Sequence, residues 1–308
     1  MIALVTGAGG FVGQNIIPYL LSNGIDTIAS YRNGENSLQD FVKEGKMDDC
    51  KINTVIHLAG KAHDLKNVSK PEEYHQVNTV LSGQIFDAFL ASDAKLFVML
   101  SSVKAVRDTL HEETLTEELV PEPGTVYGKT KLQAEEYILS QPIPEGKRVY
   151  ILRPCMIHGP GNKGNLNLLF KVAKLGIPYP LASFENQRSF LSIENLCFVI
   201  RELLERTDIP SGIYNVADDT PLSTNRVIQI MCETILKRPR LWRINKRCIK
   251  GITRVGDFLS LPLNSERLQK LTESYVVSNA KLLTSLNKPL PVSSEEGLRK
   301  TIQSFMKG

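Results

Sequence analysis

Short apolar runs alternate with helical patterns along the first half of the chain. Each run is short enough to be a strand that is buried on both faces of a sheet. The predicted strands are Ile2–Thr6, Asp26–Ser30, Thr54–Ala59, Leu96–Leu100 and Val149–Leu152, and the predicted helices are Phe11–Ser22 and Glu73–Leu90. Pro18 should kink or loosen the first helix. The alternation predicts an α/β protein with a doubly wound parallel sheet.

The second half is less regular and contains an unusual basic stretch. We expect a strand at Gly212–Val216 and helices at Asn165–Leu175, Ile193–Glu205, Thr224–Leu236 and Ser294–Phe305. Between them, Lys237–Arg254 holds eight basic residues and no acidic one. Three interpretations stay open: a solvated helix face with an apolar underside, a cationic rim for a nucleoside diphosphate, and an amphipathic element on an anionic membrane surface.

A glycine-rich turn connects the first strand to the first helix. Gly7, Gly10 and Gly13 are spaced three apart in TGAGGFVG. Gly7 permits the tight turn, Gly10 lets the backbone approach a pyrophosphate, and Gly13 lets the helix pack on the sheet, while the helix dipole favours the anion. Because the turn follows a strand and opens a helix, it predicts a Rossmann-type dinucleotide site. The alternative is a glycine-rich turn without a ligand.

The end of the second predicted strand bears on the choice of dinucleotide. An acidic residue there would bind the ribose hydroxyls of NAD, but the chain reads Ser30-Tyr31-Arg32. The guanidinium of Arg32 could pair with a 2′-phosphate. NADP(H) is therefore favoured, and the use of NAD with a solvated Arg32 is the alternative.

A serine, a tyrosine and a lysine form a candidate catalytic group. Ser102 follows the strand Leu96–Leu100, and Tyr127 and Lys131 lie four residues apart on one predicted helix face. A phenol with an ordinary pKa near 10 is a poor base at neutral pH. We expect the Lys131 ammonium and a cationic nicotinamide ring to favour the phenolate. The alternative is an ordinary helix face that carries one tyrosine and one lysine.

Composition narrows the class of protein. The chain has 308 residues, 37 basic and 33 acidic, and a net charge of +4, which is too small to indicate nucleic acid as a partner. The five cysteines are widely spaced without a CxxC pair, and the histidines lack metal-ligand spacing, so we expect reduced thiols and no metal site. The chain contains no apolar stretch of 18 residues and no signal peptide is evident, so we expect a cytoplasmic protein.

These motifs together resemble a known family. TGAGGFVG, VIHLAG, Val77-Asn78, LSSVKAV, YGKTKLQAE, ILRPCMIHGPG, RSFLSIENL, GIYNVAD and EEGL occur in the family's order. The chain resembles an extended short-chain dehydrogenase/reductase of the NAD-dependent nucleotide-sugar epimerase/dehydratase family. The resemblance implies a dinucleotide-binding domain of residues 1–155 plus 189–216, and a smaller lobe of 156–188 plus 217–308 that binds a nucleotide-diphosphate sugar. It also implies a homodimer.

The resemblance assigns roles residue by residue. It maps Ser102, Tyr127 and Lys131 to the catalytic positions. It maps Arg188, Asn165 and Arg254 to positions that contact the diphosphate or the sugar of the substrate. The expected cofactor contacts are Gly7, Gly10, Phe11, Val12, Gly13, Arg32, Leu58, Ala59, Gly60, Asn78, Tyr127, Lys131 and Pro154.

The chain departs from the family pattern at several positions. Cys155 and His158 replace commoner residues, and Ala105-Val106-Arg107 stands where the family has a VYG triplet. A third strand with an acid beside the adenine is hard to place between Arg32 and Thr54, and Asp48 or Asp49 could supply that acid. His63 could face the substrate just beyond the cofactor edge.

Two reactions at C4 of a hexose follow from the resemblance. An NADPH-dependent 4-keto reductase for surface-polysaccharide sugars is favoured, because Arg32 stands where NAD enzymes carry an acid. An NAD-dependent UDP-hexose 4-epimerase, of the UDP-glucose or UDP-N-acetylglucosamine type, is the alternative. A dinucleotide-sensing regulator without catalysis is a third hypothesis, against which the intact Ser102, Tyr127 and Lys131 count.

Overall fold

Six parallel strands form the central sheet of the computed structural model, which describes residues 1–32, 36–43, 45–61, 70–110, 113–162, 164–258 and 264–307. The strand order is β2-β1-β3-β4-β6-β9, and every neighbouring pair is parallel. The strands are β1 (Ile2–Thr6), β2 (Asp26–Ser30), β3 (Thr54–His57), β4 (Leu96–Leu100), β6 (Arg148–Pro154) and β9 (Gly212–Val216). The chain crosses from one side of β1 to the other between β2 and β3, and such a switch point opens a ligand crevice at the carboxyl ends of the strands.

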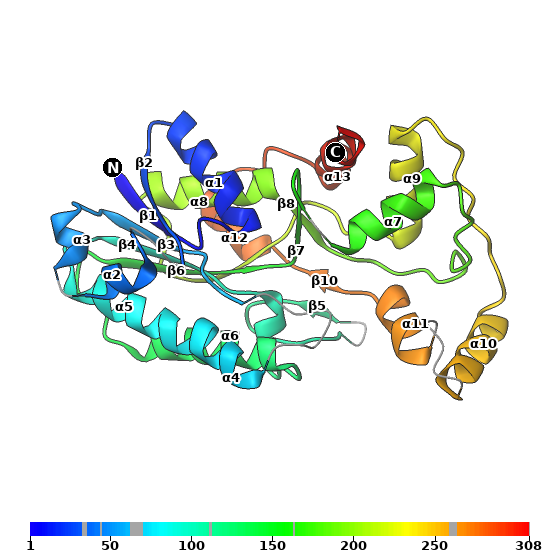
Figure 1. The fold of residues 1–308 in the computed structure, drawn as a ribbon, viewed down its shortest axis with the longest axis horizontal. Helices are drawn as coiled ribbons and strands as arrows, with labels where there is room; N and C mark the ends of the chain where they lie inside the picture. The colour runs from blue at the N-terminus through cyan, green and yellow to red at the C-terminus, as the bar shows by residue number, and fades with distance from the viewer. Residues whose placement is uncertain are drawn as a thin grey trace.

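Helices cover both faces of the sheet (Figure 1). One face carries α1 (Phe11–Ser22), α8 (Ile193–Glu205) and α12 (Ala280–Leu286), and the other carries α2 (Leu38–Val42), α5 (Leu81–Ala91) and α6 (Val126–Ser140). Two apolar cores, one on each side, explain why the strands read as continuous apolar runs. The predicted α/β class with a Rossmann-type, doubly wound sheet is confirmed.

Several predicted elements differ from the structure in their ends or internal geometry, and two of them border the site. Strand β3 stops at His57, two residues early, because the following backbone turns away to bond with Thr6 and Asn78. The helix expected at Glu73–Leu90 consists of α4 (Pro71–Tyr74), a π-helical turn η1 (His75–Val80) and α5. Helix α1 continues through Pro18 to Ser22.

The stretch between Arg32 and Thr54, where a further strand was hard to place from the sequence, contains two short helices. The described residues there form α2 and α3 (Lys46–Asp49) and no strand. The carboxylate of Asp48 accepts a hydrogen bond of 2.7 Å from the backbone N–H of Asp93, just before β4 begins. Asp48 therefore lies at the edge of the sheet opposite the glycine turn, and the neighbouring, exposed Asp49 sits on the same short helix. The segment is too short for a further strand with its crossover helix.

A smaller group of elements packs beside the carboxyl edge of the sheet (Figure 1). It comprises β7 (Met156–His158), α7 (Asn165–Lys174), β8 (Phe190–Ser192), α9 (Thr224–Thr234), α10 (Lys246–Phe258), α11 (Ser265–Thr272) and α13 (Ser294–Lys307). Its core is separate from the two cores of the sheet and includes Phe170, Ile230, Met231 and Ile302. β5 (Thr114–Leu115) and β10 (Val276–Val277) form a further short pair. The domain boundaries at 155, 189 and 217 stay a prediction.

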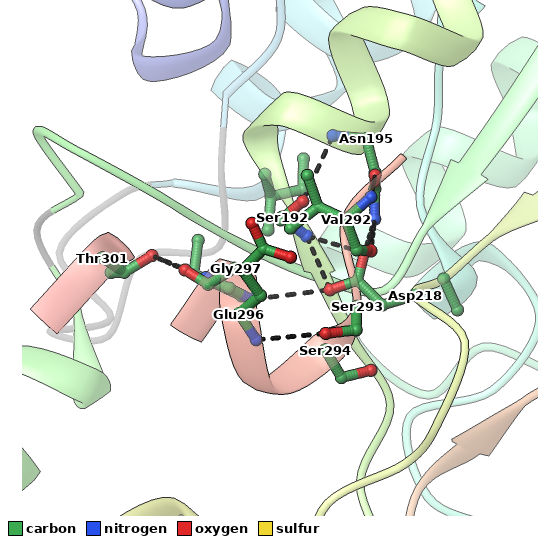
Figure 2. Close-up of polar contacts among 12 residues, drawn as sticks. Ser192, Asn195, Asp218, Val292, Ser293, Ser294, Glu296, Gly297 and Thr301 are labelled. Atoms are coloured by element: carbon green, nitrogen blue, oxygen red, sulfur yellow. Dashed lines mark hydrogen bonds and ion pairs between the residues drawn. The ribbon is translucent and has the colours of Figure 1, made fainter. Parts of the chain in front are cut away.

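A buried polar cluster ties this group to the sheet (Figure 2). The Asp218 carboxylate accepts hydrogen bonds from the backbone N–H of Ser192 and from the Asn195 amide, at 2.7–3.0 Å. The same amide of Asn195 bonds both backbone groups of Val292, in the loop before α13. His158 is buried beside this cluster and bonds the Thr301 hydroxyl at 2.8 Å. One carboxylate and one amide thus hold β8, α8 and the start of α13 in a fixed relation.

Candidate active site

A cleft of about 330 Å³ opens where the carboxyl ends of β1, β3, β4 and β6 meet helices α1 and α6. It brings together most of the residues that the sequence predicted for the cofactor and for catalysis. The lining residues are Gly7, Gly10, Phe11, Val12, Gly13, Leu58, Gly60, Lys61, Leu100, Ser101, Ser102, Tyr127, Lys131, Pro154, Cys155 and Ile157. Lys61, Leu100, Ser101, Cys155 and Ile157 were not among the predicted contacts.

The glycine turn leaves one end of α1 open to the cleft. Gly7 has a φ of +69°, and a Cβ there would lie 2.7 Å from the backbone nitrogen of Ala59. A Cβ on Gly13 would lie 2.6 Å from the carbonyl oxygens of Gly7 and Ala8, so only glycine lets α1 start here. Gly10 is the N-cap and offers no side chain, and the first turn of α1 has no acid. The free N–H groups at the start of α1 and the positive end of the helix dipole can therefore bind a diphosphate.

Tyr127 and Lys131 reach the cleft from helix α6, whose N-terminal turn is fixed by hydrogen bonds. The Thr125 hydroxyl caps the helix by accepting from the backbone N–H of Gly128 at 3.1 Å. Asp108 in turn accepts from the backbone of Gly124 and Thr125 and from the Thr125 hydroxyl, at 2.7–2.9 Å. These bonds fix the first turn of α6, so the Tyr127 side chain has a defined place beside Ser102.

The phenol of Tyr127 is held in its neutral form. Burial raises the pKa of Tyr127 above its ordinary value of 10, and a hydrogen bond with Ser102 offsets part of that shift. The expectation that the Lys131 ammonium and a cationic nicotinamide ring together favour the phenolate stays a prediction. The Lys131 ammonium donates to the carbonyl oxygen of Leu100 at 2.9 Å. Burial lowers the pKa of Lys131 to about 8, and the charge of Glu135 opposes that shift.

Asn78 shapes the floor of the cleft from the π-helical turn η1. Its side-chain oxygen accepts from the backbone N–H of Lys61 at 2.7 Å, and its amide donates to the Lys61 carbonyl and to the Thr130 hydroxyl at 3.2 Å. A Cβ on Gly60 would lie 3.0 Å from the Lys131 ammonium. Asn78 thus holds the turn after β3 in place, and Gly60 leaves room for the lysine.

A chain of buried hydrogen bonds runs under this floor through His57. The Ser82 hydroxyl donates to the Asn78 carbonyl at 2.7 Å, so it accepts from His57 Nε2 at 2.9 Å. On its other side, His57 Nδ1 accepts from the Thr6 hydroxyl at 2.9 Å, and that hydroxyl accepts from the backbone N–H of Ala59. Burial, aided by the Lys131 charge, lowers the pKa of His57 to about 3, so its ring is neutral.

A buried ion pair anchors α6 to the sheet. Glu135 lies one turn beyond Lys131 and two turns beyond Tyr127. The Arg153 guanidinium donates to both carboxylate oxygens of Glu135, at 2.5–3.1 Å. The Ser101 hydroxyl donates to the same carboxylate. Both side chains are almost fully buried. The sequence analysis missed Glu135, although its spacing of four residues from Lys131 and eight from Tyr127 could have pointed to it.

Four predicted residues lie away from this cleft or cannot be placed by their side chains. Arg32 is exposed just after β2. Arg188 pairs with Glu273 at 3.1 Å, and its Nε is buried without a partner among the described residues. Asn165 opens α7 and Arg254 lies in α10, but their side chains are outside the described part, as is the whole of His63.

The neutral His57 predicts a pH-dependent stability. Its folded-state pKa of about 3 lies below the ordinary value near 6.5, so the unfolded chain binds a proton that the folded chain does not. This contribution is complete above pH 6.5 and is lost as the pH falls toward 3. Between pH 7 and pH 5 we expect a loss of about 2 kcal/mol in the free energy of unfolding, measured by urea denaturation. His57→Gln should remove that part of the slope; equal slopes for both proteins would contradict the assignment.

The Glu135–Arg153 pair predicts a large cost when one partner is removed. Glu135→Gln leaves the buried Arg153 without a counter-charge and should lower the free energy of unfolding by about 3–5 kcal/mol. Glu194→Gln is the matched control, because it breaks an exposed pair with Lys300 that water already screens. Chemical denaturation compares the two variants. Similar small losses in both would show that the buried pair does not anchor α6.

The comparisons with known proteins agree with this arrangement. The family model described as "NAD dependent epimerase/dehydratase family" matches residues 3–217. A UDP-glucose 4-epimerase of Vibrio cholerae is 26% identical over 319 residues, covering 98% of this chain and 95% of that protein. A GDP-6-deoxy-D-mannose reductase of Pseudomonas aeruginosa is 25% identical, covering 80% of this chain and 86% of that protein.

A solved structure has the same fold over the whole chain. The UDP-N-acetylglucosamine 4-epimerase from Bacillus cereus superposes with a TM-score of 0.75 at 20% identity, covering 100% of both chains. The family match spans the glycine turn, the serine-bearing strand end and α6. The chain therefore belongs to the NAD-dependent epimerase/dehydratase family.

Proposed function

We propose that the chain is an NADP(H)-dependent oxidoreductase that reduces the C4 carbonyl of a 4-keto hexose linked to a nucleoside diphosphate. The observation that carries this proposal is the neutral Tyr127 phenol, which is hydrogen-bonded to Ser102 inside the cleft. Reduction of a ketone needs a proton donor at the oxygen, and a phenol with a raised pKa holds its proton at physiological pH.

The residues of the cleft fit a nicotinamide dinucleotide. The uncapped start of α1 would hold the diphosphate, with Gly10, Phe11 and Val12 closest to it. Leu58, Ala59, Gly60 and Pro154 would line the rest of the cofactor, over the turn that Asn78 fixes. When it is bound, the dinucleotide supplies the hydride chemistry, and the remaining work falls to side chains of this chain.

Proton transfer is assigned to Tyr127, with two supporting groups. Ser102 is placed to bond the substrate oxygen that receives the proton, because its hydroxyl already bonds the phenol. The Lys131 ammonium lines the same cleft from the same helix as Tyr127, and it would stabilise the phenolate left after transfer. The neutral thiol of Cys155, whose pKa burial raises, adds an uncharged wall to the same cleft.

The preference for NADP(H) rests on Arg32. It is exposed at the end of β2, where an acid would bind the ribose of NAD, and Tyr31 lies against the glycine turn at Gly9. A guanidinium at this position can form an ion pair with the 2′-phosphate of NADP(H).

The substrate diphosphate is assigned to Arg188, with Asn165 and Arg254 as further contacts by resemblance. Arg188 is already charged and half-buried beside Glu273, and its unpartnered Nε offers a donor to an incoming phosphate. We also propose a homodimer on the strength of the family resemblance.

A 4-epimerase is the second candidate. It is favoured by the match to the Vibrio cholerae UDP-glucose 4-epimerase over 98% of this chain. An epimerase inverts C4 without consuming cofactor, so it would keep NAD bound through every turnover.

One experiment separates the two candidates. The cofactor released from the purified protein is identified by mass spectrometry, and NADPH oxidation is followed with a UDP-linked 4-keto-6-deoxy sugar. The proposal expects no retained NAD, oxidation of NADPH, and loss of the preference for NADPH over NADH in Arg32→Glu. Stoichiometric bound NAD, together with equilibration of UDP-glucose and UDP-galactose without added cofactor, would overturn it in favour of the epimerase.

Tyr127→Phe tests the proton donor. The variant keeps the ring in its place beside α6 but removes the proton, so turnover should fall by at least about a hundredfold. Cofactor affinity, measured by fluorescence titration with NADPH, should change little. Turnover close to that of the natural protein would assign the acid to another residue, and loss of NADPH binding would show that the phenol serves the site in another way.

A further inference from the structure

The charge of the chain is divided unequally along its length. Residues 159–183 and 236–256 contain eleven lysines and arginines and no aspartate or glutamate. The rest of the chain, with 26 basic and 33 acidic residues, is net negative. The basic stretch noted in the sequence is therefore half of a larger feature, and the proposed reaction uses only two of its residues, Asn165 and Arg254.

The fold joins the two segments into one surface. The backbone N–H of Tyr179 donates to the Arg240 carbonyl at 2.8 Å, and the N–H of Trp242 donates to the Tyr179 carbonyl at 2.9 Å. The Lys237 ammonium donates to the carbonyl of Lys174 at the end of α7. Residues 237–245 are thus extended beside 174–182, and the helix expected for the basic stretch begins only at Lys246.

Exposed apolar side chains stand among these cations. Leu236 is 95% exposed, Leu175 is 74% exposed and Trp242 is 57% exposed. Leu168 and Ile177 are exposed as well. Leu168 lies on α7 and Leu175 caps its C-terminal end, seven residues later, and Lys171 and Lys174 are exposed between them, so the outer side of this helix is apolar and basic. We call the exposed residues of 168–177 and 236–247 the basic face.

The basic face is distinct from the catalytic cleft. None of the residues that line the cleft belongs to it. Figure 1 shows α7 and α10 at the end of the molecule that is farthest from β2 and α3. A site for the nucleotide sugar would not need leucines and a tryptophan pointing into solvent on this outer side.

We propose that the basic face docks onto the surface of an anionic lipid bilayer. Lysines and arginines are attracted to anionic headgroups, exposed leucines enter the acyl boundary, and tryptophan favours the interface between the two. A nucleic acid could bind the lysines and arginines of the basic face, but it would gain nothing from the exposed leucines. Self-association through this face would bring its positive charges against those of a second copy. No helix in the described ranges is long and apolar enough to cross a membrane. The proposal does not rest on the reaction assigned above.

Trp242 reports on this docking directly, because it is the only tryptophan in the chain. The full-length protein is mixed with vesicles of phosphatidylglycerol and phosphatidylcholine, or of phosphatidylcholine alone. We expect a blue shift of the tryptophan emission and flotation with the anionic vesicles only. Brominated acyl chains should quench the emission, and raised salt should weaken binding. An unchanged spectrum without flotation would overturn the proposal, as would equal binding to both vesicle types.

Matched variants assign the effect to the face. Arg238→Glu/Arg243→Glu should lower the vesicle partition coefficient about tenfold or more, and Leu175→Ser/Leu236→Ser should lower it while leaving the long-range attraction in place. Lys51→Glu/Lys95→Glu reverses two exposed charges elsewhere and should bind as the natural protein does. Thermal unfolding and far-ultraviolet circular dichroism confirm that each variant is folded. Equal losses in all three variants would overturn the assignment. So would a tryptophan shift caused by an oligonucleotide, or by raised protein concentration, and not by vesicles.

Discussion

The seating of α6 against the carboxyl edge of the sheet is the constraint on which the site depends. Two buried charged side chains of this helix face the sheet, and each meets a specific partner there: Lys131 donates to the Leu100 carbonyl, and Glu135 accepts from Arg153 and Ser101. Buried charges are costly unless they are paired, so the helix has one position in which both are satisfied. That position places Tyr127 beside Ser102.

Burial then decides the chemistry of the cleft. It raises the pKa of Tyr127, lowers that of Lys131 and keeps His57 neutral. The start of α1 differs from this buried group, because Gly10 is exposed and the N–H groups of the first turn are open to an anion. A neutral phenol that is hydrogen-bonded to the Ser102 hydroxyl holds the proton that the proposed reduction requires.

Much of this arrangement could be predicted from local sequence, and the rest depends on long-range contacts. The buried strands, the glycine turn and the Tyr127–Lys131 spacing follow from patterns within about ten residues. The end of β3 could not be placed, because it is set by Thr6 and Asn78, which lie far away in the sequence. The burial of Tyr127 could not be predicted either, since spacing shows that two residues share a helix face but not how far each is removed from water. The sequence offered Asp48 and Asp49 as candidate acids without placing either, because composition cannot tell which edge of a sheet a short helix reaches.

The central claim is that burial, rather than the neighbouring lysine, sets the protonation of Tyr127 in the free protein. Its pKa can be measured by NMR of tyrosine labelled at Cζ, with the resonance assigned through Tyr127→Phe. The account predicts that this phenol titrates above the ordinary value of about 10 when no cofactor is bound. A phenol that titrates below that value in the free protein would contradict it.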